Sequence, residues 1–249
     1  MMRKRTIIVL AVSILFIAIS LNPMFLMIKE HWTGTQIMNR YEVDHAYIKD
    51  GYPRILDARE IEVEGMRIEI LEKDTGKDAP ETFWDKEEGV PGGAIVTVQI
   101  RINGVNIAEP TELWLSNRDR GSRYFSWLDV LTVKDRTIQE NSIAIVQRLT
   151  DDEGRMEDRK WRIVSVKYDG TWKDEVLTYK ERSENPLGVR MVTVSGTSMM
   201  AMGYHSDILQ SYPTLFFPLI YPWITSVIGV MLLVIGAVMI GKDRFYTKI

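Results

Sequence analysis

The sequence contains no cysteine, so disulfide bonds, thiolate metal ligands and a lipid-modified cysteine are all excluded. It also contains no Asn-X-Ser/Thr acceptor for N-linked glycans. A eukaryotic domain of this size on the cell surface usually carries disulfides or glycans. The two absences together favour a bacterial or archaeal protein.

Histidine is scarce as well, with three copies at His31, His45 and His205. Three scattered histidines do not show the ligand spacing of a zinc site. The segment 199–202 holds three methionines near His205, and such soft ligands suit Cu(I). Side chains of adjacent methionines point in different directions, however, so the sequence predicts neither a metal nor a cofactor.

No histidine lies between Asp74 and Ser198, and this absence bears on a possible protease motif. The segment 196–199, Gly-Thr-Ser-Met, resembles the turn that carries the nucleophilic serine of subtilisin-like proteases, and Asp74-Thr75-Gly76 resembles their Asp motif. That family carries Asp, His and Ser in this chain order. We therefore predict that Ser198 is not a nucleophile and that residues 195–213 lead into a second apolar segment.

Charged residues are absent from two apolar stretches, residues 7–28 and 219–240, each 22 residues long. At ~1.5 Å per residue, either stretch can cross a hydrocarbon core of ~30 Å. We predict transmembrane helices at 7–28 and 214–241. The first stretch is longer than the apolar core of a usual signal peptide, which favours an uncleaved anchor over a cleaved signal sequence.

Basic residues flank both predicted helices on their terminal sides. They are Arg3, Lys4 and Arg5 before the first helix, and Lys242, Arg244 and Lys248 after the second, with Asp243 as the one acidic residue among them. The positive-inside rule then predicts cytoplasmic tails at 1–6 and 242–249 and a domain at 29–213 outside the cell membrane.

The predicted outside domain is acidic, with 25 basic and 33 acidic residues and so a net charge of about −8. Nucleic acid is recognised through basic surfaces, which makes it a poor match for this domain. The expected partners are the lipid bilayer and other membrane or envelope proteins.

Residues 94–108 carry the clearest local signal in the chain. Apolar and other residues alternate on both sides of Asn103-Gly104, a dipeptide typical of two-residue hairpin turns. Such a turn places Ile102 opposite Val105 and Ile100 opposite Ile107. We therefore predict a β-hairpin here.

Further short segments have strand character and recur every 10 to 20 residues without helical patterns between them. The candidates are 61–70, with a bulge or turn at Gly65, and then 113–116, 124–133, 142–148, 161–168, 174–179 and 189–194. This spacing indicates an antiparallel sheet fold. A short amphipathic helix is predicted at 35–48, and a long loop at 73–93. The predicted class is mainly β, with an external antiparallel β-sandwich or barrel-like domain between two transmembrane α-helices.

Two groups of residues are candidate contacts for a partner. Arg118, Arg120 and Arg123 surround Gly121, and three guanidinium groups can grip a phosphate or carboxylate; the alternative is a solvated turn. Trp84 and Trp172 lie in predicted loops and are the candidates for exposed aromatic contacts.

Small residues in the second apolar segment form one helical strip. Gly229 and Gly236 are seven residues apart, and Thr225 lies one turn before Gly229. Small residues let helices approach closely in lipid. We predict that this strip packs on another helix, and the first transmembrane helix is the natural partner.

The pattern favours a non-enzymatic, two-pass membrane protein whose external β-domain binds or scaffolds a partner in a membrane-associated complex. The alternative is a membrane-anchored hydrolase of the cell envelope, for which Asp44 and Glu88 are the candidate carboxylates.

Overall fold

The computed structural model describes residues 4–49, 52–53, 59–81, 86–87, 89–115, 123–150, 155–198, 200, 202–211 and 217–246. The chain divides into two compact units. One combines Met1–Thr33 with His205–Ile249, and the other is the continuous segment Gly34–Tyr204. Because so much of the chain is helical, the class is mixed α and β, and the predicted mainly-β class is too narrow.

The first unit contains two helices that are long and apolar enough to cross a membrane. They are α1 (Lys4–Arg40), of which the part up to Thr33 belongs to this unit, and α5 (Thr225–Tyr246), preceded by the π-helical turn η3 (Leu219–Ile224). Only 17% and 11% of their most apolar 18-residue windows are buried. A core helix of a water-soluble protein would bury its apolar residues, and these helices expose them.

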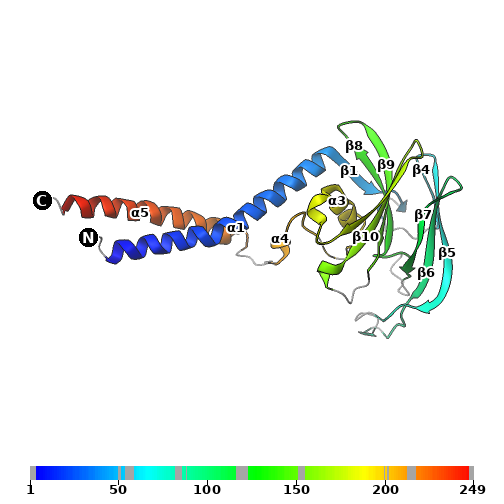
Figure 1. Ribbon diagram of the computed structural model, residues 1–249, viewed down its shortest axis with the longest axis horizontal. Coiled ribbons are helices and arrows are strands. Elements are labelled where there is room, and N and C mark those ends of the chain that lie inside the picture. The colour runs from blue at the N-terminus through cyan, green and yellow to red at the C-terminus, as the bar shows by residue number, and fades with distance from the viewer. Residues whose placement is uncertain are drawn as a thin grey trace. The chain divides into compact units, whose positions relative to one another are not determined.

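α1 and α5 lie side by side in this unit (Figure 1). Ser13 Oγ donates to the Gly229 carbonyl at 2.9 Å, and Ser20 Oγ lies 2.9 Å from Thr225 Oγ1. Polar side chains in apolar helices reduce their cost by such hydrogen bonds between helices. The short helix α4 (Ile208–Ser211) also belongs to this unit.

The second unit is built on two antiparallel sheets. The five-stranded sheet has the order β1-β8-β9-β10-β11, and the four-stranded sheet has the order β4-β5-β6-β7. β2 and β3 form a separate pair. The strands are β1 (Tyr41–His45), β2 (Ile48–Lys49), β3 (Tyr52–Pro53), β4 (Glu60–Val63), β5 (Met66–Asp78), β6 (Ala94–Ile102), β7 (Val105–Trp114), β8 (Leu128–Asp135), β9 (Glu140–Arg148), β10 (Lys160–Lys167) and β11 (Trp172–Thr178).

The two sheets pack face to face in a sandwich-like arrangement (Figure 1). One buried cluster joins Ile68 and Ile100 of the four-stranded sheet to Val130, Ile145 and Val164 of the five-stranded sheet. A second cluster covers the opposite face of the five-stranded sheet with α3 (Pro186–Val194). The unit therefore has three layers, and both faces of the five-stranded sheet are buried.

A buried arginine ties the two sheets together. Arg162 on β10 is 5% exposed and binds Asp174 on β11 through both carboxylate oxygens, with its Nε–H and Nη2–H at 2.9 and 2.6 Å. Its Nη1–H donates to the Glu109 carbonyl of β7 at 2.5 Å. The guanidinium is thereby satisfied on both sides of the sandwich, as a buried charge must be.

The hairpin at Asn103-Gly104 is confirmed in its register, with Ile102 opposite Val105 and Ile100 opposite Ile107. Asn103 and Gly104 both have positive φ, 49° and 82°, which this turn requires. The turn predicted at Gly65 is also present, between β4 and β5. The loop predicted at 73–93 is wrong for its first six residues, because β5 continues to Asp78 beside β6.

The helix predicted at 35–48 is wrong beyond Arg40, where α1 ends and β1 begins. Met38, Tyr41, His45 and Ile48 fit a helical period, but Tyr41 and His45 also alternate with Val43 by two. Val43 is 5% exposed and packs in the α3-side cluster. Burial of this alternating face and the backbone pairing of β1 with β8 together favour the strand over the helix.

The strand predicted at 189–194 is also wrong, because the segment forms the second half of α3. Asn185 caps this helix, with its Oδ1 accepting the Gly188 N–H at 2.8 Å, and Pro186 occupies the first helical turn. Both are helix-start signals. Val189 and Val192 are then buried on one side of the helix against the sheet.

Candidate functional site

The inner face of the five-stranded sheet changes from apolar to polar at one end. On β8 the inward positions run from the buried Leu128 and Val130 to Thr132 and then Lys134. Sandwich strands normally keep inward positions apolar along their length. The reversal marks the place where the apolar core between the sheets ends and a polar opening begins.

The strand register shows which residues share this opening. Asp44 pairs with Thr132, and Glu42 pairs with Lys134, which in turn pairs with Asn141. Paired residues on neighbouring strands project from the same face of a sheet. Two adjacent rows of polar side chains from β1, β8 and β9 therefore meet at the open end.

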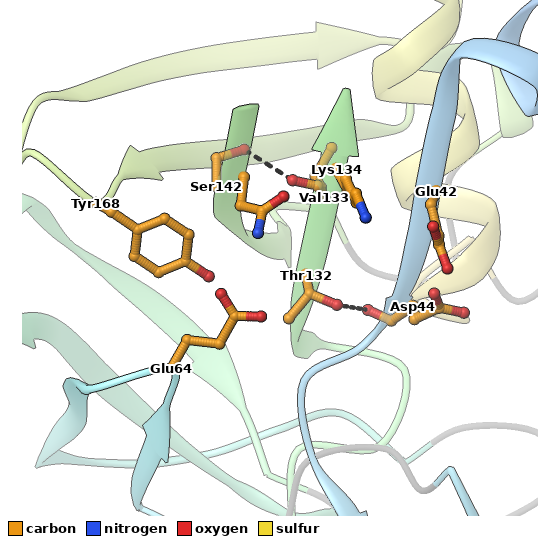
Figure 2. Close-up of a pocket in the computed structure, with 9 residues that line it drawn as sticks. Glu42, Asp44, Glu64, Thr132, Val133, Lys134, Ser142 and Tyr168 are labelled. Carbon is orange, nitrogen blue, oxygen red and sulfur yellow. Dashed lines mark hydrogen bonds between the residues drawn. The ribbon is translucent and has the colours of Figure 1, made fainter. Parts of the chain in front are cut away.

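These rows line a hollow of about 200 Å³ (Figure 2). The hollow is bounded on the other side by Glu64, from the turn between β4 and β5 of the four-stranded sheet. Its lining residues, from both sheets, are Glu42, Asp44, Glu64, Thr132, Val133, Lys134, Asn141, Ser142 and Tyr168.

Tyr168 and Glu64 point toward one another across the hollow (Figure 2). Partial burial raises the pKa of the Tyr168 hydroxyl, and its hydrogen bond to the Glu64 carboxylate raises the pKa further. The tyrosine is therefore a neutral donor at neutral pH. The pair connects the two sheets at the mouth of the hollow.

The remaining charges of the hollow are largely balanced. Glu42 forms an ion pair with Arg136 at 3.3 Å, and Lys134 lies in the row beside it. Asp44 presents its side chain to the same opening, and its backbone carbonyl is 3.5 Å from Thr132 Oγ1. The site offers carboxylate acceptors together with ammonium and amide donors, a set suited to binding a polar molecule.

Trp172 lies next to this end of the sheet. It is the first residue of the edge strand β11 and pairs with Val166 on β10, whose side chain faces the inner core. Tyr168 is the next inward residue after Val166. Tyr168 lines the hollow and is 38% exposed, whereas Trp172 is 48% exposed and lies on β11, which β10 separates from β9.

Arg123, a predicted partner contact, is held within the domain by Glu72. Its Nε–H and Nη2–H donate to the two Glu72 oxygens, each at 2.7 Å, and Tyr124 donates to the same carboxylate at 2.5 Å. The hydrogen bonds of Arg123 and Tyr124 lower the pKa of Glu72, although burial opposes them. The other predicted contacts, Arg118, Arg120 and Trp84, lie outside the described residues, as does Glu88.

The predicted helix-packing residues lie along α1. A Cβ placed on Gly229 would be 2.9 Å from Ile17 Cγ1 and 3.2 Å from the Ile17 backbone nitrogen. A Cβ placed on Gly236 would be 2.5 Å from Leu10 Cδ2. Thr225 contacts Ser20 through its hydroxyl.

Ser198 lies in a buried turn that follows α3. Its Oγ donates to the Met200 carbonyl at 2.5 Å, and its own carbonyl accepts from Arg159 at 3.0 Å. The indole N–H of Trp161 donates to the neighbouring Thr197 carbonyl at 3.2 Å. These bonds give the segment a structural role, which is to close the α3 layer over the sheet.

The methionines near His205 and His205 itself lie in different settings. Met202 is 5% exposed and packs in the α3-side cluster, whereas Met200 is 56% exposed. His205 Nε2 lies 3.0 Å from Thr33 Oγ1 in the first unit. Among the residues that the structure describes, no three His, Cys, Asp or Glu side chains are grouped for a metal ion.

Most of the hollow could not be recognised in the sequence, where Asp44 alone was named. The available signal was the interruption of the apolar alternation on β8 at Thr132 and Lys134. Comparisons of the chain with protein-family models, with curated proteins and with solved structures give no match.

Proposed function

We propose that this chain is a two-pass cell-membrane protein whose β-domain lies outside and binds or scaffolds a partner of the cell envelope. The observation that carries the proposal is the polar hollow, which lies where the apolar core cluster between the two sheets ends. Binding sites are usually concave, and converging polar groups fix the orientation of the ligand in them. The two apolar helices supply the attachment to the bilayer.

The packing of α1 and α5 supports one orientation. Gly236 faces Leu10 and Gly229 faces Ile17, so the helices are antiparallel. Their basic ends, with Lys4 and Arg5 on α1 and Lys242 on α5, come to the same end of the pair. Basic residues favour the cytoplasmic side, and the domain between the two helices then lies on the opposite side.

Cysteine labelling tests the orientation, because the native chain has no cysteine to interfere. We expect Lys173→Cys to react with a membrane-impermeant maleimide on intact cells, after removal of any outer envelope. Lys242→Cys should react only after the membrane is permeabilised. Labelling of Lys242→Cys in sealed cells, with Lys173→Cys protected, would reverse the proposed topology.

Co-purification tests the binding role. The full chain is extracted in detergent, and bound envelope components are identified by mass for three forms of the protein. We expect at least one component that is retained by the native chain and by Lys160→Glu, an exposed control on β10, but lost from Thr132→Arg. Thr132 lines the hollow, so the arginine side chain should occupy the hollow and leave the rest of the domain surface unchanged. An identical set of components in all three forms would remove the hollow from the function.

A further inference from the structure

We infer that the hollow binds a neutral saccharide, with one sugar ring among the polar rows beside Tyr168 and a further sugar unit outside the hollow toward Trp172. The inference deepens the proposed function and rests on the same hollow being its binding site. It specifies a chemical class of ligand, which the binding proposal itself leaves open.

The charge balance of the hollow points to a neutral ligand. Three carboxylates, from Glu42, Asp44 and Glu64, stand beside two basic groups, from Lys134 and Arg136, which leaves a local net charge of −1. Glu42 is already paired with Arg136, and Glu64 already accepts from Tyr168. These carboxylates would repel a phosphate, and Lys134 would repel a polyamine. A strongly charged ligand therefore gains little here.

The hydrogen-bonding groups of the hollow suit a polyhydroxyl ligand. Each sugar hydroxyl donates one hydrogen bond and accepts others. Lys134 and Asn141 supply donors, and the carboxylates of Asp44 and Glu64 supply acceptors from the two opposing sheets. A site with both kinds of group on facing walls can satisfy adjacent hydroxyls of one ring, which limits the cost of removing them from water.

The aromatic side chains complete the site. Trp172 and Tyr168 are 48% and 38% exposed at the same end of the inner face, and the register of β10 with β11 fixes this position. A pyranose ring carries hydroxyls on its edge and C–H groups on its faces, so it matches an aromatic side chain beside polar rows. The hollow of about 200 Å³ is smaller than the ~300–1,000 Å³ of sites for drug-sized ligands, which suits a single ring with further units outside.

Saturation-transfer NMR on the full chain tests this inference. The protein is kept in a phosphocholine detergent, because maltoside detergents carry sugar headgroups of their own. The probes are maltotriose, cellotriose and chitotriose, with spermidine and inorganic phosphate as charged comparisons. We expect transfer to at least one neutral trisaccharide and no competition from either charged probe.

Matched variants locate the site. We expect Trp172→Ala and Asn141→Ala to weaken trisaccharide binding at least tenfold. Val176→Ala, an exposed residue farther along the same strand, and Asn106→Ala, an exposed asparagine on β7, should bind as the native chain does. Near-native thermal transitions of all four variants ensure that the loss concerns the site and not the fold.

Three results would overturn the inference: no transfer to any trisaccharide, transfer that persists unchanged in Trp172→Ala and Asn141→Ala, or binding of spermidine or phosphate in place of sugar. These failures are distinguishable from failure of the proposed function. If Thr132→Arg still loses an envelope component while no sugar binds, the binding role stands and the saccharide assignment alone fails.

Discussion

Replacing Gly229 with leucine is expected to separate α1 from α5 and to lower sharply the amount of folded protein in the membrane. A Cβ at this position would be 3.2 Å from the Ile17 backbone nitrogen and 3.2 Å from Phe16 Cβ. Neither atom is the free end of a flexible side chain, so the helix backbone itself must move. Separation also removes the hydrogen bond from Ser13 to the Gly229 carbonyl.

The expected cost is about 1–3 kcal/mol for overpacking, with the lost interhelical hydrogen bond adding about 0.6 kcal/mol. The measurements are the protein level in membranes and the thermal transition in detergent. Gly241→Leu is the matched control, because a Cβ at Gly241 meets nothing within 4 Å.

Gly236→Ala gives an internal comparison. Its added methyl would meet Leu10 Cδ2 at 2.5 Å, but this is the end of a flexible side chain that can turn away. We expect a smaller effect at Gly236 than the same alanine produces at Gly229. Equal tolerance of Gly229→Leu and Gly241→Leu would show that the helices do not depend on close packing.

Local signals in the sequence were sufficient where a turn sets the register. Asn103-Gly104 fixes the pairing of its two strands because both residues adopt the positive φ that few other residues tolerate. The apolar segment that contains Gly229 was similarly easy to assign as a helix, because a long run without charge has few structural alternatives. In both cases the determinant lies within a few residues of the element it specifies.

Long-range packing decided the elements that the sequence analysis missed. Residues 41–45 fit both a helical and a strand period, and pairing with β8 settles the choice. For α3, the Asn185-Pro186 start signal was present but competed with the strand-like composition of Val189–Val194. Burial of the Val189 side against the five-stranded sheet makes the helix stable there.

The hollow could not be predicted from the sequence for a related reason. Its residues come from β1, β8 and β9, the end of β10 and the turn between β4 and β5. The order β1-β8-β9-β10-β11 brings an early strand beside a much later one, and no local pattern encodes that neighbour. A polar residue such as Thr132 reads as an ordinary surface position until the facing sheet is known.

The attachment of β1 is expected to depend on pH through His45. Its Nδ1 lies 2.6 Å from Asp129 Oδ2, and the Asp129 side chain is fully buried with its other oxygen accepting the Val130 N–H at 2.9 Å. The hydrogen bond to Asp129 raises the pKa of His45 above its usual value, against the opposing effect of burial, and the charge of nearby Asp44 adds to the rise. The folded domain therefore favours the protonated imidazolium.

The sign of the pH effect follows from this raised pKa. The stabilisation is fully present below the unfolded histidine pKa of ~6.5 and is lost as the pH rises through the folded pKa of His45. We expect the free energy of unfolding of the β-domain, followed by tryptophan fluorescence in denaturant, to fall as the pH rises above ~6.5. His31→Gln, an exposed histidine on α1, should keep this slope.

His45→Phe should abolish the slope and lower the stability at every pH in this range. It removes the imidazolium that pairs with the buried Asp129 carboxylate, and breaking a buried ion pair costs about 3–5 kcal/mol. Because β1 carries Glu42 and Asp44 into the hollow, the same variant should also weaken ligand binding. Asp129→Asn removes the buried carboxylate charge and with it the main cause of the raised pKa of His45. It should therefore flatten the dependence of the unfolding free energy on pH, with a smaller loss of stability than His45→Phe. A slope that survives in both variants would assign the pH dependence to another group.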